Sequence, residues 1–403
     1  KKLKNGGAAI SEVISKYNLA IKGGFKSKDS DIPINKRKST SEYWNYNYIE
    51  VEKSKDLRQF QVISNKTFKQ KLDELYLKGD IQENLKVPQI TESLAFKGKK
   101  LLIKKGLDKY LNHRTVSAFY EKDCVFSSTI ASIVPISGKM SNEVENSLLC
   151  MSAIFNSKLF TYHLLMTSSS FGAGRNRVNF VEFLEMPYQE DLELSILTKE
   201  LHNLLKGDFF NENQEKVYLI EKQIENKIYK LYNVNSIEQE LVNYALNISI
   251  PVMKRADRLN KNHLLIFKKI TKKTVTVLEE YCQIFINHFS DRFNNTNKYF
   301  IIDVYINKDF IALHFVISNE KKEKTITHFF NSSLEDSINK IGGLGIQNVS
   351  TNLFAQQDIR GFNKSSFYVI KPNINKNWHK AIAHLDLSEF IEAIAKSEIK
   401  KTN

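Results

Sequence analysis

The sequence predicts an α+β protein whose strand-rich and helix-rich segments lie in different parts of the chain. Up to residue 190, apolar segments rich in β-branched and aromatic residues alternate with helical patterns, as in a mixed α/β domain. Residues 191–254 carry apolar positions every three or four residues, the spacing of amphipathic helices joined as a hairpin connector. Strand and helix patterns return together in residues 255–403, which we expect to form a separate C-terminal α+β domain.

The composition indicates a globular protein with a polyanionic partner. The 403 residues are 42% hydrophobic and 26% charged, and they carry a formal net charge of +14. This length is enough for two or three domains with their own cores. A positive excess of this size is typical of proteins that bind nucleic acid or, second, an anionic membrane. The alternative is that the charge only reflects a lysine-rich, AT-biased genome.

Cysteine usage and hydropathy predict a cytoplasmic protein. Cys124, Cys150 and Cys282 lie far apart without metal-type spacing, which favours a reducing compartment. No apolar run approaches the roughly 18–20 residues of a membrane span, so we expect no membrane partner. Because the chain begins with Lys1 and not with methionine, the sequence is also consistent with a fragment or a processed product.

The stretch from Phe96 to Tyr188 organises the first region. A basic strand-like segment, Lys99–Lys105, is followed by a second apolar segment that runs from Ala118 to Val134. One long helix is predicted next, because these apolar residues recur every three or four positions: Val144, Leu148, Met151, Phe155, Leu159, Tyr162 and Met166. We expect the helix to end in a loop over residues 167–177, where three serines and two glycines cannot continue it.

The remaining elements are predicted from the same periodicities. In the first region we expect a strand over residues 57–63 and a helix over 66–78. The connector should hold helices over 192–205, 214–232 and 236–246, closed by Pro251, and it is a candidate strut or homodimer surface. In the last domain we expect helices over 274–292, 334–341 and 387–395, strands over 299–306, 310–317, 325–330 and 366–370, and a hairpin turn at 307–309.

The predicted functional site recognises an anion. Basic residues lie on or beside the basic strand and at the end of the long helix. Lysines attract phosphates without regard to sequence, whereas the planar fork of arginine can also read a guanine edge, and serine hydroxyls can donate to phosphate oxygens. The expected DNA-binding residues are Lys104, Lys105, Arg114, Lys158, Ser168, Ser169, Ser170, Arg175, Asn176 and Arg177. An ordinary solvated charged face is the alternative.

The sequence contains no motif for methyl or phosphoryl transfer. Asn-Pro-Pro-Tyr, Asp-Pro-Pro-Tyr and a P-loop are absent, and the glycine-containing stretches at 171–174 and 342–345 are predicted to be turns. We therefore expect no catalytic residue and no metal ligand in this chain. One alternative is a metal-dependent nuclease in the last domain, because Asp303 and Glu320–Lys322 imitate an acidic nuclease pattern. The other is a non-catalytic assembly scaffold built on the helical hairpin.

Four segments of the first region together resemble a known family. They are Leu101–Gly106, Ala118–Ser128, Ile154–Phe160 and Thr167–Phe171. In combination they are similar to the target-recognition domain that follows the catalytic domain in adenine-specific DNA methyltransferases of restriction–modification systems; type I specificity subunits carry related domains. The resemblance covers about residues 10–190, and the helices to about residue 250 are similar to the connector that follows. The segments Asp358–Phe362 and Phe367–Pro372, leading to Trp378, resemble part of an appendage of phage-defence methyltransferases.

The resemblance implies DNA recognition without catalysis by this chain alone. It implies a specificity region that holds duplex DNA for an adenine-N6 methyltransferase of a restriction–modification or phage-defence system. The S-adenosylmethionine cofactor would bind to a partner subunit or to a catalytic domain missing from this fragment, because this chain lacks the Asn-Pro-Pro-Tyr motif. The implied partners are double-stranded DNA and that methyltransferase.

Overall fold

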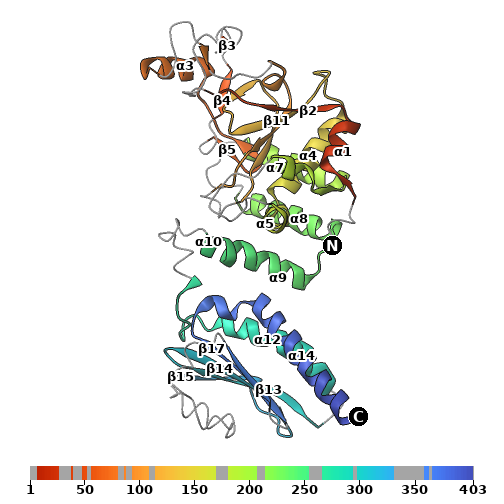
Figure 1. Cartoon of the computed structure of the whole chain (residues 1–403), viewed down its shortest axis with the longest axis vertical. Helices are drawn as coiled ribbons and strands as arrows, with labels where there is room; N and C mark the ends of the chain where they lie inside the picture. The colour runs from red at the N-terminus through yellow and green to blue at the C-terminus, as the bar shows by residue number, and fades with distance from the viewer. Residues whose placement is uncertain are drawn as a thin grey trace. The chain divides into compact units, whose positions relative to one another are not determined.

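The computed structural model has an α+β fold (Figure 1). It describes residues 7–26, 38–39, 48–51, 56–79, 86–87, 93–108, 114–168, 180–206, 214–253, 266–293, 297–330, 358–362 and 365–402. The chain divides into two compact units, Lys1–Leu246 and Asn247–Asn403, and each has its own sheet. The helices predicted as a connector therefore belong to the first unit, and the second unit begins somewhat before the predicted boundary at residue 255.

The first unit is built on a four-stranded antiparallel sheet with the order β2-β11-β8-β9. Its strands are β2 (Leu19–Gly23), β8 (Lys100–Lys104), β9 (Ser117–Tyr120) and β11 (Ile130–Pro135). Every residue of the two central strands, β8 and β11, is buried. Strands buried on both faces are usually continuous apolar runs, so the lysines at both ends of β8 need a separate explanation.

The first unit also contains four short strand pairings, three between segments far apart in sequence and one local hairpin. β1 (Ala8–Ala9) pairs with β12 (Pro187–Tyr188), β3 (Lys38–Ser39) with β7 (Lys86–Val87), β4 (Ile49–Val51) with β10 (Cys124–Phe126), and β5 (Leu57–Arg58) with β6 (Gln61–Val62). The last pair is a tight hairpin where one strand over 57–63 was predicted, so that prediction is wrong. The chain reverses at Phe60, whose φ of 62° is left-handed and whose amide donates to the Ser117 carbonyl (2.8 Å).

Helices surround this sheet. They are α1 (Ile10–Lys16), α3 (Phe68–Leu77), α4 (Asn142–Asn156), α5 (Lys158–Thr167), α6 (Phe180–Leu184), α7 (Leu192–Leu205), α8 (Gln214–Leu231) and α9 (Ser236–Tyr244), with a 3₁₀ turn at Ser93–Ala95. The helices predicted over 66–78, 192–205, 214–232 and 236–246 are confirmed to within a few residues. α4 contacts β8 and β9 on one side and α7 on another, which explains why nearly all of its residues are buried.

The chain is still helical at Pro251. A π-helical turn, Ala245–Ser249, follows α9 and leads into α10 (Ile250–Met253), so Pro251 lies inside a helix and the prediction that it closes the unit is wrong. Proline has no N–H to donate, and the irregular hydrogen bonding of a π-helical turn accommodates this loss.

The predicted long helix is in fact two helices. α4 ends at Asn156, α5 begins at Lys158, and Ser157 between them has extended backbone angles of φ −70° and ψ 155°. The Ser157 hydroxyl accepts a hydrogen bond from the Phe160 amide (3.0 Å) and donates one to the Ile154 carbonyl (2.7 Å). The break occupies a single residue, so apolar residues still recur every three or four positions on both sides of it. For this reason the spacing predicts one continuous helix.

Replacing Ser157 by alanine should lower the free energy of unfolding of the first unit by about 0.5–2 kcal/mol, because alanine cannot cap α5. Ser157→Gly should cost only a few tenths of a kcal/mol, since glycine is well tolerated at this position of a helix. Urea unfolding of both variants measures the difference. Unchanged stability of the alanine variant would show that the serine does not hold the break.

The second unit contains a five-stranded sheet with the order β15-β13-β14-β17-β16. Its strands are β13 (Tyr299–Ile306), β14 (Phe310–Ser318), β15 (Ile326–Phe330), β16 (Ile359–Phe362) and β17 (Ser366–Pro372). β15 is parallel to β13 and the other pairs are antiparallel, so the predicted hairpin with its turn at 307–309 is confirmed. The predicted helix over 334–341 and the glycine-rich loop at 342–345 lie outside the described residues.

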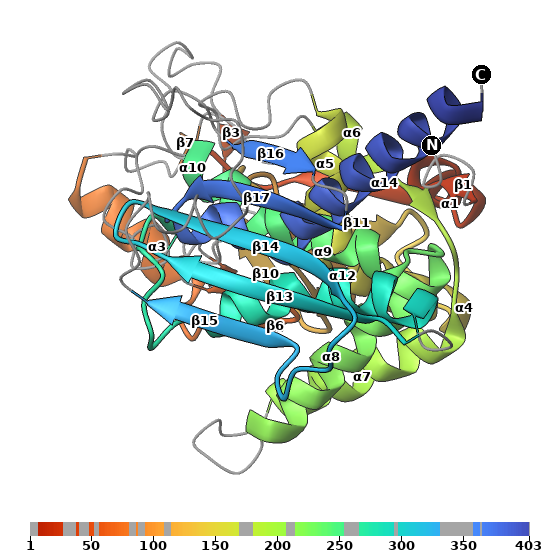
Figure 2. The same cartoon turned by 90° about the horizontal axis from the view of Figure 1, so that it is seen from below.

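Two helices, α12 (Thr276–Phe293) and α14 (Lys380–Thr402), cover one face of this sheet (Figures 1 and 2). A 3₁₀ turn at Asn375–Trp378 leads into α14, and the core between helices and sheet is aromatic; the Phe285 and Phe315 rings, for example, stack at 4.4 Å. α14 begins well before the predicted start at residue 387. Asp386 interrupts the apolar pattern there, yet it is 1% exposed and lies inside the unit.

Candidate functional site

Lys104, predicted to contact DNA phosphates, is used inside the protein. Its side chain is only 8% exposed, and its Nζ lies 2.6 Å from Oδ2 of the buried Asp108. The Asp108 amide donates to the Arg114 carbonyl (2.8 Å), so this ion pair lies close to the backbone of Arg114. A buried cation that already has a carboxylate partner is not available to a phosphate. The phosphate contact stays a prediction, and the structure gives Lys104 a structural role instead.

Lys100, at the other end of β8, is fully buried. Its Nζ donates to the Gly98 carbonyl (2.5 Å) and to the Lys122 carbonyl (2.8 Å) and lies 5.8 Å from the centre of the Tyr120 ring. Removal from water lowers the pKa of Lys100. The two lysines of β8 thus bind oxygen atoms within the unit, which explains how a strand with charged ends can be buried.

The stability of the first unit should therefore rise with pH in a way that depends on Lys100. Because its pKa is lower in the folded than in the unfolded chain, the unfolded chain binds more protons between these two pKa values, and stability increases as pH rises through that window. Lys100→Met should lose this increase on the alkaline side below the ordinary lysine pKa, whereas Lys139→Met, at an exposed position, should keep it. Melting temperatures across that range provide the measurement; identical pH profiles of the two variants would contradict the lowered pKa.

Lys105 lies at one end of the sheet, close to a segment that carries two more lysines, one in β2 and one just after it. Its amide donates to the Thr129 carbonyl (2.9 Å), and its Nζ is 3.3 Å from the point that a Cβ on Gly23 would occupy. Gly23 follows Lys22 and ends β2, and Lys26 comes shortly after it. Because Gly23 pairs with Ala131 and Lys104 with Ile130, β2 and β8 end at the same edge. We call Lys22, Lys26 and Lys105 the lysine end of the sheet.

A pair of glycines makes the lysine end possible. A Cβ on Gly24 would lie 2.0 Å from the Phe126 carbonyl oxygen, so no larger residue fits where the chain leaves β2. The next residue, Phe25, fastens the chain there: its amide donates to Phe126 (3.0 Å), and its carbonyl accepts from Ser128 (2.6 Å). Lys26 is thereby held close to the β10–β11 turn.

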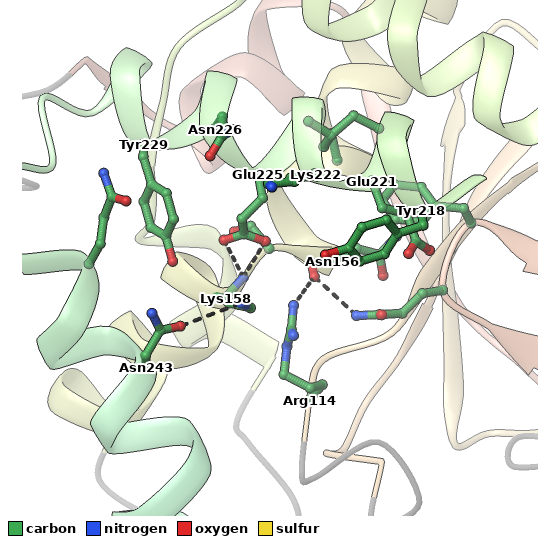
Figure 3. A pocket seen from close by; sticks show the side chains of 16 residues that line it. Arg114, Asn156, Lys158, Tyr218, Glu221, Lys222, Glu225, Asn226, Tyr229 and Asn243 are labelled. Atoms are coloured by element: carbon green, nitrogen blue, oxygen red, sulfur yellow. Dashed lines mark hydrogen bonds between the residues drawn. The ribbon is translucent and has the colours of Figure 1, made fainter. Parts of the chain in front are cut away.

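Arg114 and Lys158, also predicted to bind DNA, are brought together in a pocket of about 360 Å³ (Figure 3). One wall is the α4–α5 break with Asn156, and the facing wall is α8, which contributes Glu221, Lys222, Glu225 and Tyr229. Figure 3 shows these α8 side chains on the opposite side of the pocket from Arg114. The structure therefore joins two predicted residues that are far apart in sequence, and it adds acidic residues that were not predicted.

The charges on this pocket complement the two helix ends at the break. Arg114 Nη2 donates to the Asn156 carbonyl at the C-terminus of α4 (2.5 Å), where Gln59 Nε2 also donates (3.0 Å). The Glu225 carboxylate accepts from the Lys158 amide at the N-terminus of α5 (3.1 and 3.2 Å). A cation at a helix C-terminus and an anion at an N-terminus are both favourable. Part of the role of Arg114 and Glu225 is thus structural.

Two polar atoms at the pocket have no hydrogen-bond partner. They are Nε of Arg114 and the hydroxyl of Tyr229, a residue only 5% exposed. Burial lowers the pKa of Arg114; burial, with nearby Glu225 adding to it, raises the pKa of Tyr229. Partial removal from water also raises the pKa of Glu221, and Arg114 opposes that shift. The pocket therefore has hydrogen-bonding capacity that the protein does not use.

The remaining predicted site residues divide into one described residue and five others. Ser168 caps the end of α5, and its Oγ donates to a Glu182 carboxylate oxygen (2.5 Å), so this hydroxyl is engaged within the unit. Ser169, Ser170, Arg175, Asn176 and Arg177 lie outside the described residues. Their predicted contacts with bases and phosphates stay predictions.

Asp303, part of the acidic pattern that suggested a nuclease, forms an ion pair within the second unit. Asp303 on β13 accepts a hydrogen bond from Lys322 Nζ at 3.1 Å. Among the residues that the structure describes, no three His, Cys, Asp or Glu side chains are grouped so that they could hold a metal ion. A lysine bound to Asp303 occupies the place that a divalent cation would need, so the arrangement does not favour metal chemistry there.

The pocket residues on α8 were not predicted from the sequence, although their spacing along the helix could have indicated them. Glu221, Glu225 and Tyr229 are spaced four residues apart and therefore line one face of the helix. A row of acids beside the apolar stripe is an ordinary feature of an exposed helix. Only the packing of α8 against the α4–α5 break relates that row to Arg114.

The sequence matches no protein-family model, and no curated protein is found to be related to it. In the part of the chain that the structure describes, no helix has both the length and the apolar character needed to cross a bilayer. The arrangement of charges in the structure and the resemblance of the first region to target-recognition domains are therefore the two observations that bear on function.

Proposed function

We propose that the first unit binds duplex DNA and supplies sequence recognition to an adenine-specific DNA methyltransferase. The observation that carries the proposal is the lysine end of the sheet, where Lys105, which follows β8, lies beside Gly23 of the segment that carries Lys22 and Lys26. Ammonium groups on long, flexible stems neutralise phosphates and release counterions, which is the main source of sequence-independent DNA affinity. A phosphate backbone that crosses this edge would meet all three lysines.

The distribution of charge supports placing DNA on the sheet region. Residues 1–190 contain 30 lysines and arginines against 20 aspartates and glutamates, whereas residues 191–246 contain 6 against 10. The positive excess of the first unit thus belongs to residues 1–190, and the segment 191–246 is net negative. A polyanion is attracted to the former and repelled by the latter.

The proposal assigns base reading to a different set of residues. Arg175, Asn176 and Arg177, with Ser169 and Ser170, have the side chains for base-edge and phosphate contacts. Lys104, Arg114, Lys158 and Ser168 are not assigned a DNA contact in this proposal; their polar side-chain atoms bind protein atoms of the first unit. The methyl transfer and the S-adenosylmethionine would belong to a partner subunit or a further domain, since this chain lacks the Asn-Pro-Pro-Tyr motif.

The experiment that tests the proposal is a titration of a fluorescently labelled duplex with the full chain, followed by anisotropy at several salt concentrations. We expect binding that weakens steeply with salt, because it rests on phosphate contacts. The absence of binding at low salt, with the protein folded, would contradict the proposal.

One observation favours an assembly role as the second candidate function. Leu192 and Ile196, one turn apart on α7, are 62% and 57% exposed, although both are large apolar residues. Protein that binds no DNA but self-associates in light scattering would support this candidate. In that outcome the positive charge of the sheet region would be incidental.

A further inference from the structure

Five charged side chains line the pocket at the α4–α5 break, yet no two of them form an ion pair. Arg114, Lys158 and Lys222 are cationic, and Glu221 and Glu225 are anionic. Glu225 is engaged by the Lys158 backbone amide, and Lys158 Nζ lies near only an amide oxygen, Oδ1 of Asn243, at 3.4 Å. Among these described residues, Arg114 and Glu221 have no oppositely charged side chain within ion-pair distance.

This arrangement is unusual because flexible side chains of opposite charge, once in the same pocket, gain by pairing. Two hydrogen bonds hold the charges apart here. Arg114 donates to the Asn156 carbonyl, and the Glu225 carboxylate accepts from the Lys158 amide at the start of α5. The separation leaves a cationic side at Arg114 and an anionic side at Glu221, with a volume of about 360 Å³ between the walls. A cavity of this size accepts a small molecule.

We propose that the pocket binds a small zwitterion of the α-amino-acid type. Its carboxylate is received by the Arg114 guanidinium, whose Nε has no hydrogen-bond partner among the described residues. Its ammonium group faces Glu221, whose carboxylate has no protein partner among the described residues. Both ligand charges are then paired. The inference does not depend on DNA binding.

The mixture of charges argues against other classes of ligand. A phosphate or another polyanion would place more negative charge beside Glu221 and Glu225, and a simple amine would face Arg114 with its two neighbouring lysines. An uncharged molecule would leave the separated charges without counter-charges. Only a ligand with both charges a few bonds apart matches both sides of the pocket.

The test begins with thermal melting of the full chain in the presence of each of the twenty L-amino acids. We expect at least one of them to raise the melting temperature by a few degrees in a saturable manner, as a ligand specific for the folded state must. The carboxamide of that amino acid and its N-acetyl derivative should give no rise, because each lacks one of the two charges. Inorganic phosphate and adenosine serve as probes of the excluded classes. No rise with any amino acid, or equal rises with the blocked derivatives, would overturn the proposal.

Variants then locate the site. Glu221→Gln should weaken binding of the amino acid at least about tenfold, which is the scale of one charge-assisted hydrogen bond. Glu215→Gln is the matched control, because it makes the same change on the same helix outside the pocket. Equal affinity of the two glutamine variants would place the ligand elsewhere and contradict the inference.

Discussion

Replacing Asp386 by alanine should remove about 3–5 kcal/mol from the free energy of unfolding of the second unit. Asp386 is 1% exposed and accepts hydrogen bonds from Tyr281, Arg360 and Lys371. Without its carboxylate, the buried Lys371 would lose its ion-pair partner and face Arg360, which would keep its pairs with Asp358 and Glu389. Burial already lowers the pKa of Lys371, and Asp386 is what opposes that shift. The expected loss is therefore among the largest that a single substitution can cause.

The fluorescence of Trp378 can measure this loss of stability in the second unit. It is one of two tryptophans in the chain and is fully buried in the second unit, so its fluorescence in a Trp44→Phe background follows the unfolding of that unit in urea. The matched control is Glu389→Gln, since Glu389 also pairs with Arg360 but is 54% exposed. A surface partner of this kind contributes less than about 1 kcal/mol. Equal losses for the two variants would mean that burial does not set the strength of the cluster.

A double variant separates the loss of the ion pair from the loss of packing. Asp386→Leu with Lys371→Met replaces the buried pair by apolar side chains, and such replacements are often neutral or stabilising. We expect the double variant to recover much of the stability that Asp386→Ala loses. If it is as unstable as the alanine variant, the cluster is held by its shape and not by its charges.

Long periodic segments could be predicted from the sequence, and single-residue features could not. α7 has the bounds expected from its apolar spacing, and Asp191 caps it by accepting from the Leu194 amide (2.8 Å). Ser157 and Phe60 each redirect the backbone at one position, and neither changes the pattern of apolar residues around it. The spacing of apolar residues predicts which face of a helix is buried. It does not predict a break that leaves this spacing unchanged.

Charged residues were the main source of error about burial. Lys100, Lys104 and Asp386 belong to residue types that are mostly exposed, and each is buried with its charge bound by an oxygen or nitrogen atom of the same unit. The charge of a residue can be read from the sequence, whereas its partner depends on strand register and helix packing. Asp108, four residues after Lys104, illustrates this: the spacing alone does not predict that both turn inward.

The candidate sites were predicted in part. Arg114 and Lys158 were selected from the sequence and do line one pocket, although Glu221 and Glu225 were not foreseen there. The lysine end was also only partly foreseen: Lys105 was selected, but its proximity to β2 depends on the pairing of β2 with β11. Contacts of this kind join segments about a hundred residues apart and follow from the topology of the sheet.

The lysine end should account for most of the affinity for DNA. Replacing Lys22, Lys26 and Lys105 together by glutamine should weaken duplex binding by about two orders of magnitude at low salt. It should also reduce the slope of log affinity against log salt by about one for each lost phosphate contact, or about three in total. The loss should be similar for every duplex sequence, because contacts to phosphates carry no sequence information.

The matched control changes three other lysines of the same unit to glutamine. Lys78, Lys122 and Lys139 are exposed and are not part of the lysine end, so this variant loses the same total charge. We expect its salt slope to remain close to that of the original protein. A difference between the two triple variants would then report the location of the charge and not its amount.

The most direct measurement of the central claim is the salt dependence of duplex binding for the original chain and these two triple variants, by anisotropy over about 50–200 mM salt. The account predicts steep, nearly parallel lines for the original chain and the control, and a weaker and flatter line for the variant that lacks Lys22, Lys26 and Lys105. Three parallel lines of equal affinity, or no binding by the original chain, would contradict DNA recognition at the lysine end of the sheet.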